Sequence, residues 1–98
     1  MTNTVPTYIN FGAEAIIGQM HRVRLWLQMR HGTRLGDVYM SPIEWWINTG
    51  RASTPFLKAF CKADYHSIGR ILEKGGSDQD VVRKLLKRFR LDIYSAYF

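Results

Sequence analysis

Apolar residues recur at helical spacing along most of this chain, in four segments that glycines separate. Gly32, Gly50 and the pair Gly75-Gly76 interrupt the pattern, and glycine is the residue most often found just past the end of a helix. The spacing therefore predicts a mostly α fold, a small bundle of four to five helices. Three places remain open for a short extended segment: 4–9, 37–40 and 91–98.

The length of 98 residues predicts a single helical domain over 1–98, because a chain of this size buries roughly 60–65% of its unfolded surface around one core. No apolar run approaches the ~20 residues of a membrane-spanning helix, and the first ten residues lack the pattern of a signal peptide. The lone Cys61 can form no internal disulfide, which is typical of a reducing compartment. We expect a cytoplasmic protein without a membrane span.

The first helix is predicted from about Phe11 to His31, with Asn10 as a candidate N-cap. Trp26 is expected in the core. The predicted apolar face is broad, which indicates the central helix of the bundle. Its members are Ile16, Ile17, Met20, Val23 and Leu27, widened by Leu25 and Trp26.

A connector is predicted over 33–40, followed by a short helix from Ser41 to about Asn48. The run Ser41-Pro42-Ile43-Glu44 has the order of a capping box with proline at the first helical position, where no N–H is required. This arrangement predicts a helix start at Ser41.

Two more helix starts follow the same logic. Thr54-Pro55 predicts a helix from Pro55 to about Ala63, and Asp64 is a candidate cap for either a continuation of that helix or a new helix, which ends at Lys74.

The segment 78–90 is the most strongly amphipathic part of the chain. Ser77 is expected to cap it, and the acidic residues that follow suit the positive end of the helix dipole. One face is apolar: Val81, Val82, Leu85, Leu86 and Phe89. The other face is basic: Arg83, Lys84, Lys87, Arg88 and Arg90. The last eight residues, 91–98, either extend this helix or form a strand against 4–11.

The excess of basic residues favours a polyanionic partner. Fourteen Lys and Arg oppose eight Asp and Glu, for a net charge of +6, which suits nucleic acid, anionic lipid or an acidic protein surface. A ridge on one side of a helix attracts phosphates through counterion release, independently of base sequence. We therefore expect the five basic residues of 78–90 to contact nucleic acid, with Arg70 and Lys74 extending the patch. The same residues also fit an ordinary solvated helix face.

The segment 68–86, IGRILEKGGSDQDVVRKLL, resembles a helix-turn-helix unit. Alignment of Gly76 with the turn glycine puts Ile71, Val82 and Leu85 at core positions, as that unit requires. The resemblance implies that the helix after the turn would face DNA.

The segment departs from the helix-turn-helix pattern at several positions. Leu72 stands where a small residue lets the two helices approach, and Ser77 stands where an apolar residue is usual. Asp78 and Asp80 would face phosphates of the same sign. These departures put sequence-specific recognition in doubt.

Aromatic residues support a different function. Adjacent helical positions point about 100° apart, so of Trp45 and Trp46 one is expected in the core and the other is a candidate anchor for a partner. The terminal aromatics Tyr94, Tyr97 and Phe98 either pack on the domain or form a self-association patch. The alternative is therefore a protein-binding inhibitor or adaptor, of the type that phages and other mobile elements encode, or a homodimer.

Recognisable catalytic chemistry is lacking. The three histidines and Cys61 do not have the paired spacing of a zinc site, and the Gly75-Gly76-Ser77 turn lacks the Lys-Ser/Thr of a phosphate-binding loop. We expect a non-enzymatic regulatory or accessory protein that requires no metal or cofactor.

Overall fold

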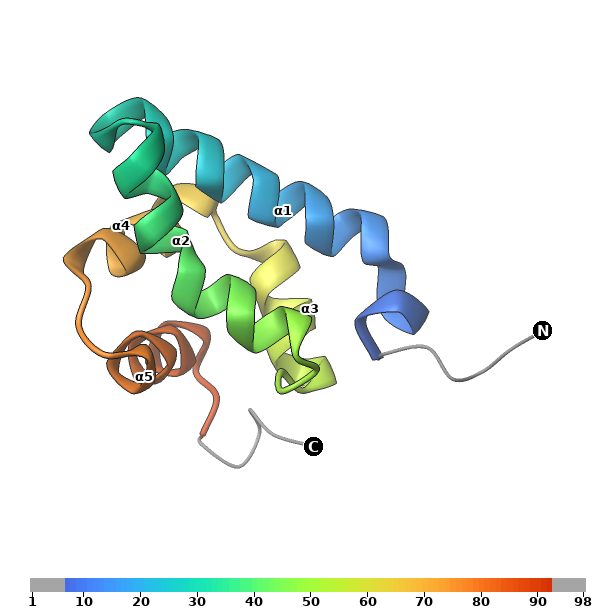
Figure 1. The fold of residues 1–98 in the computed structure, drawn as a ribbon. Coiled ribbons are helices and arrows are strands. Elements are labelled where there is room, and N and C mark those ends of the chain that lie inside the picture. Colours follow the sequence, from blue (N-terminus) through green and yellow to red (C-terminus); the bar gives the residue numbers. More distant parts are fainter. Residues whose placement is uncertain (1–6, 93–98) are drawn as a thin grey trace.

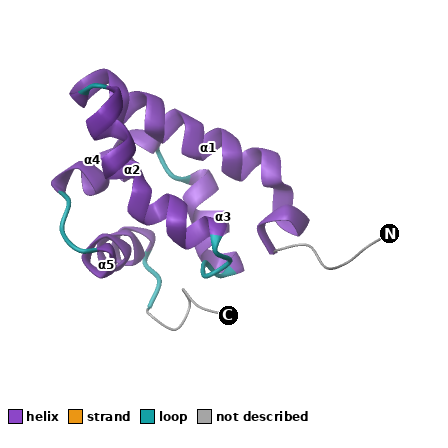
Figure 2. Cartoon of the chain, viewed as in Figure 1, coloured by secondary structure: helices purple, strands orange, loops and turns teal. Residues whose placement is uncertain are grey.

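The computed structural model describes residues 7–92, which form five helices and no strand within that range (Figures 1 and 2). The predicted all-α bundle is therefore confirmed. The helices are α1 (Thr7–His31), α2 (Thr33–Asn48), α3 (Thr54–Lys62), α4 (Tyr65–Lys74) and α5 (Asp78–Phe89).

Helix α1 is the central helix, as its sequence predicted. It crosses the molecule, and α2, α3 and α4 all pack against it (Figure 1). Helix α5 packs instead against α2, α3 and α4. Within residues 7–92, none of the helices combines the length and the apolar character needed to cross a lipid bilayer.

The predicted start and apolar face of α1 need correction. The helix begins at Thr7 and is interrupted at Gly12, whose φ of 131° and ψ of 81° are not helical. Val23 is fully buried, whereas Ile17 is 60% exposed and Leu25 is 43% exposed. Each residue turns a helix by about 100°, and the neighbouring helices cover α1 on one side only, so both side chains fall outside the buried arc.

Helix α2 starts earlier than predicted, and no extended segment occurs at 37–40. The helix runs unbroken through Pro42, with Met40 fully buried. The Ser41 hydroxyl, expected to cap a new helix, donates to the Val38 carbonyl at 3.1 Å. In a regular helix the Val38 carbonyl would accept a hydrogen bond from the backbone N–H of residue 42. Residue 42 is proline and has no N–H, so this bond is missing. Tertiary burial thus overrides the local start signal, and the serine compensates for the proline.

The other two candidate extended segments, 4–9 and 91–98, are only partly covered by the described residues. Residues 7–9 are helical, and residues 91–92 form neither helix nor strand. The remainder of 4–9 and of 91–98 lies outside the described residues.

Side-chain caps begin the last three helices. Ser53, one residue before the predicted Thr54, accepts from the backbone N–H of Phe56 at 3.4 Å. Asp64 caps α4, as predicted. Ser77 accepts from the Asp80 backbone N–H at 3.1 Å and donates its own backbone N–H to the Asp80 carboxylate at 3.2 Å. This reciprocal capping box fixes the first turn of α5.

Phe56 of α3 joins three helices in the core. Its ring lies 4.7 Å from that of Trp46, 6.3 Å from that of Phe60 and 5.3 Å from that of Phe89, measured between centroids. Helix α5 is thus held to α3 by aromatic contact.

Gln19 is a buried polar residue that the sequence did not single out. Its side chain is 3% exposed, and its amide nitrogen donates to the carbonyls of Phe60 at 3.0 Å and Ala63 at 2.6 Å. Both carbonyls lie at the C-terminal end of α3, where a helix lacks partners of its own. An α1 side chain therefore completes the end of α3.

Two glycines set the distance between α1 and its neighbours. A Cβ atom at Gly36 of α2 would lie 2.7 Å from the backbone nitrogen of Gln28. A Cβ atom at Gly69 of α4 would lie 2.3 Å from the Trp26 ring. Both α2 and α4 therefore approach α1 more closely than any other residue at these positions would allow.

Gly36→Ala should destabilise the fold by about 2–3 kcal/mol, because backbone atoms of α1 must move to admit the methyl group. Gly18→Ala is the matched control within α1, since its methyl group would meet only the Arg22 guanidinium at 3.6 Å. The control should stabilise by roughly 0.5–1 kcal/mol. Urea denaturation followed by circular dichroism measures both changes. Equal changes in the free energy of unfolding for the two variants would contradict the steric role of Gly36.

Gln19→Leu should cost roughly 2 kcal/mol or more, because it keeps the side-chain volume but leaves the Phe60 and Ala63 carbonyls without a donor. Gln79→Leu, at an exposed position of α5, should change the unfolding free energy by less than about 1 kcal/mol. The same denaturation measurement applies, and a Gln19 variant as stable as the control would contradict the capping role.

Candidate nucleic-acid interface

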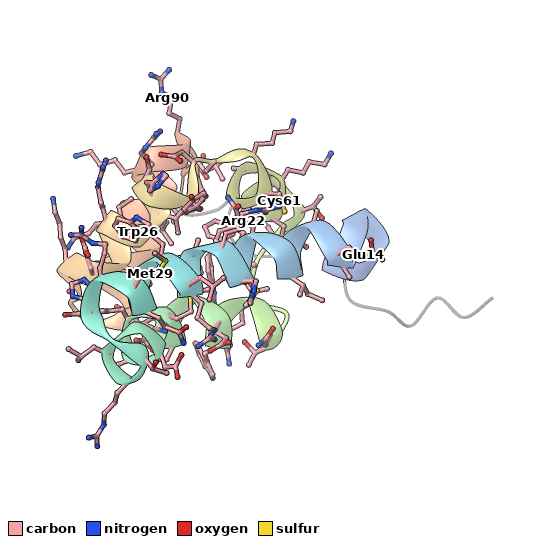
Figure 3. All side chains as sticks on the ribbon, turned by 90° about the horizontal axis from the view of Figure 1, so that it is seen from above. Glu14, Arg22, Trp26, Met29, Cys61 and Arg90 are labelled. Atoms are coloured by element: carbon pink, nitrogen blue, oxygen red, sulfur yellow. The ribbon has the colours of Figure 1, made fainter. Side chains whose placement is uncertain are left out.

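The predicted amphipathic character of α5 is confirmed. Val81, Leu85 and Leu86 are buried, and the basic residues of the helix are exposed. Arg90 follows the helix in the left-handed conformation, with φ of 59°, and its side chain points away from the body of the protein (Figure 3). The helix thus has an apolar side against the core and a basic side in solvent.

The basic side of α5 continues onto α4. Arg70 and Lys74 are exposed on α4, and the Arg88 guanidinium reaches Ser67 of α4 at 3.5 Å. All seven predicted contact residues are exposed on these two adjacent helices, and we call this set the cationic surface: Arg70, Lys74, Arg83, Lys84, Lys87, Arg88 and Arg90.

The Glu73 carboxylate of α4 is engaged with α1 and not with the cationic surface. Glu73 of α4 accepts two hydrogen bonds from Arg30 of α1, at 2.9 Å and 3.1 Å, and contacts His31 at 2.5 Å. The hydrogen bonds from Arg30 lower the pKa of the Glu73 carboxyl, and His31 adds to the effect although desolvation opposes it. Glu73 therefore stays ionised and pairs with α1.

A second group of carboxylates joins α2 to α1. Arg24 of α1 donates to both Asp37 and Glu44 of α2. The hydrogen bond to Glu44 is the main reason that the pKa of Arg24 is raised. Arg24, Arg30, His31 and His66 form ion pairs with carboxylates, and none of these pairs involves the cationic surface.

The first turn of α5 is acidic. The backbone N–H of Ser77 lowers the pKa of the Asp80 carboxyl, with smaller contributions from the Ser77 hydroxyl, Arg83 and Lys84. Asp78 is exposed in the same turn. The positive field is therefore weakest at the start of α5 and strongest over its second half.

The α4–α5 pair shares some features with a helix-turn-helix unit. Gly75 and Gly76 form the turn with φ of 69° and 108°, values that favour glycine. Val82 and Leu85 are buried, as the alignment requires, whereas Ile71 is only partly buried. The tightest approach made by α4, at Gly69, is to α1 and not to α5, and acidic residues occupy the start of α5.

A groove of about 370 Å³ lies between α2 and the start of α5. Its apolar walls come from Pro42 and Trp45 of α2 and from Val82 and Leu86 of α5. Its polar members are Arg51, Asp78, Gln79 and Arg83. Arg83 thus belongs to both the groove and the cationic surface.

The two adjacent tryptophans divide as predicted. Trp46 is 3% exposed and lies in the core, whereas Trp45 is 49% exposed. The Arg51 guanidinium lies over the Trp45 ring, 4.7 Å from the centroid. Trp45 is therefore the member of the pair that can meet a partner, and the candidates Tyr94, Tyr97 and Phe98 lie outside the described residues.

Trp26, which was expected in the core, is only partly buried and packs against the core between α1 and α4 (Figure 3). Arg30 covers one face of its ring at 4.6 Å. This placement agrees with a structural role.

Cys61 is half-buried beside the core, and burial raises the pKa of its thiol. The thiolate is therefore disfavoured at this position. Among residues 7–92, no three His, Cys, Asp or Glu side chains converge in a way that would hold a metal ion.

Comparisons with known proteins give no relative: no protein-family model, no curated protein and no solved structure matches this chain.

Proposed function

We propose that the protein is a non-enzymatic accessory protein that binds nucleic acid through the cationic surface. The observation that supports this function best is the separation of charge between helices. Arg24 and Arg30 of α1 are paired with carboxylates of α2 and α4, and Arg22 of α1 donates to Gln19, whereas the basic residues of α5 and of the exposed side of α4 lie together in solvent.

Binding of this kind depends mainly on the phosphate backbone. Lysine and arginine side chains displace the counterions that surround nucleic acid, so affinity falls as salt rises. The acidic residues Asp78 and Asp80 stand where a recognition helix usually approaches base edges. The proposal is therefore binding with little dependence on base sequence.

The double variant Lys84→Glu/Lys87→Glu should weaken binding to a DNA fragment by at least about tenfold at moderate salt. The plot of log affinity against log salt should become shallower by about 2, since roughly 0.9 counterion is released per phosphate contact on a duplex. Fluorescence anisotropy with an end-labelled duplex, titrated at several salt concentrations, measures both quantities.

Arg34→Glu/Lys62→Glu is the matched control, because it changes the net charge equally at exposed positions of α2 and α3. Its affinity should stay within about threefold of the unmodified protein. Equal weakening by both variants would show that only the net charge matters. Binding to phosphatidylserine vesicles without binding to DNA would contradict the proposal in favour of a membrane surface.

Protein binding is a second candidate function, and an apolar stripe on α2 favours it. Leu35, Val38 and Trp45 are 47%, 58% and 49% exposed, and Pro42 lies between them. Their spacing of three, four and three residues is that of a helix–helix seam. An antiparallel second copy would place Leu35 opposite Trp45 and Val38 opposite Pro42, so the stripe is self-complementary.

Val38→Glu should abolish concentration-dependent dimerisation if the stripe forms this seam, because it buries an unpaired charge at the centre. Leu25→Glu, on the outer side of α1, is the control and should leave association unchanged. Sedimentation velocity over a range of concentrations measures both. A protein that remains monomeric throughout would exclude the second copy as the partner.

A further inference from the structure

We propose that the groove between α2 and α5 holds an unpaired base of a single-stranded nucleic acid whose phosphates lie on the cationic surface. This inference rests on the proposed function and names the class of nucleic acid that the site would take. It joins two features that the sequence presented separately, the exposed tryptophan and the basic helix.

Arg83 provides the continuity between the two features. It lines the groove and lies one helical turn before Lys87 on the same exposed side of α5. A strand with one phosphate on Lys87 would therefore bring its next nucleotides to Arg83 and the mouth of the groove. Arg51 also lines the groove, together with the Asp78 carboxylate.

Trp45 provides a surface on which a base can stack. Its ring is half-exposed and lines the groove, and the Arg51 guanidinium lies over one of its two faces, so a base would stack either on the other face or in place of that guanidinium. Proteins that bind single strands combine such aromatic side chains with a positively charged path for the backbone. The groove and the cationic surface together have both parts.

The size and the polar groups of the groove also suit a base. Its volume of about 370 Å³ lies within the range of roughly 300–1,000 Å³ that is common for small-molecule sites. Pro42, Val82 and Leu86 are apolar residues of its lining. The Asp78 carboxylate accepts hydrogen bonds, and the Gln79 amide both donates and accepts them, as the edge of an unpaired base requires.

A base-paired duplex does not fit this arrangement as well. Its bases are already stacked and would have to leave the helix to reach Trp45, at a cost of a few kcal/mol. The phosphates of a duplex can still contact Lys84, Lys87 and Arg88. The composite site therefore prefers an unpaired strand, while the cationic surface alone does not.

The test compares three ligands that carry similar phosphates: a single strand of about 20 thymidines, an abasic strand of the same length and a duplex. The full chain should bind the thymidine strand at least about fivefold more tightly than the abasic strand. A uridine strand of the same length should behave as the thymidine strand, with any difference reporting a preference for RNA or DNA. Quenching of tryptophan fluorescence and anisotropy give the affinities.

Trp45→Leu should remove the preference for bases and leave affinity for the abasic strand and the duplex unchanged. Trp45→Phe, which keeps an aromatic ring, should retain most of the preference. Because Trp45 is half-exposed, neither change should prevent folding, and circular dichroism checks this.

The failures of the two proposals are distinguishable. If Trp45→Leu binds the thymidine strand as tightly as the unmodified protein while Lys84→Glu/Lys87→Glu weakens binding, the groove inference is overturned and the cationic surface stands. If none of the three ligands binds, both proposals are overturned, and an acidic protein segment becomes the candidate occupant of the groove.

Discussion

The close approach of α2 and α4 to α1 determines which charged side chains of these helices pair with one another. Gly36 and Gly69 allow that approach, because any side chain there would collide with Gln28 or Trp26. With the helices at this distance, Arg24 reaches the carboxylates of α2 and Arg30 reaches Glu73 of α4. Packing that is steric in origin therefore also decides which charges become neutralised.

Helix α5 is held in a different way. It does not pack against α1, and its contacts with the core are made by aliphatic side chains and by Phe89, which meets Phe56 at 5.3 Å. Its basic side takes no part in the ion pairs of Arg24, Arg30, His31 and His66. The side chains that stabilise α5 against the core are therefore different from those that carry its charge. Substitutions at the exposed Lys84 and Lys87 can test the proposed binding without disturbing the core.

Sequence reasoning succeeded where local and tertiary signals agree. The periodicity of α5, its Ser77 cap and the division of Trp45 from Trp46 were predictable because each follows from spacing within a few residues. The Ser41-Pro42 signal failed because burial of Met40 keeps the helix continuous and Ser41 compensates for the missing N–H. Gln19 and the α2–α5 groove were not predictable, since each depends on residues more than thirty positions apart.

The capping of α5 also limits how it can hold a phosphate. A helix N-terminus usually attracts anions through its free N–H groups and its dipole. Here the Ser77 hydroxyl already accepts from the Asp80 backbone N–H, and two carboxylates occupy the first turn. In the proposed complex, phosphates would therefore contact side chains of the second half of the helix, which are long and rotatable. Contacts of that kind adapt to many backbone geometries, so selectivity would have to come from a more rigid element, such as the half-exposed ring of Trp45, which lines the same groove as Arg83.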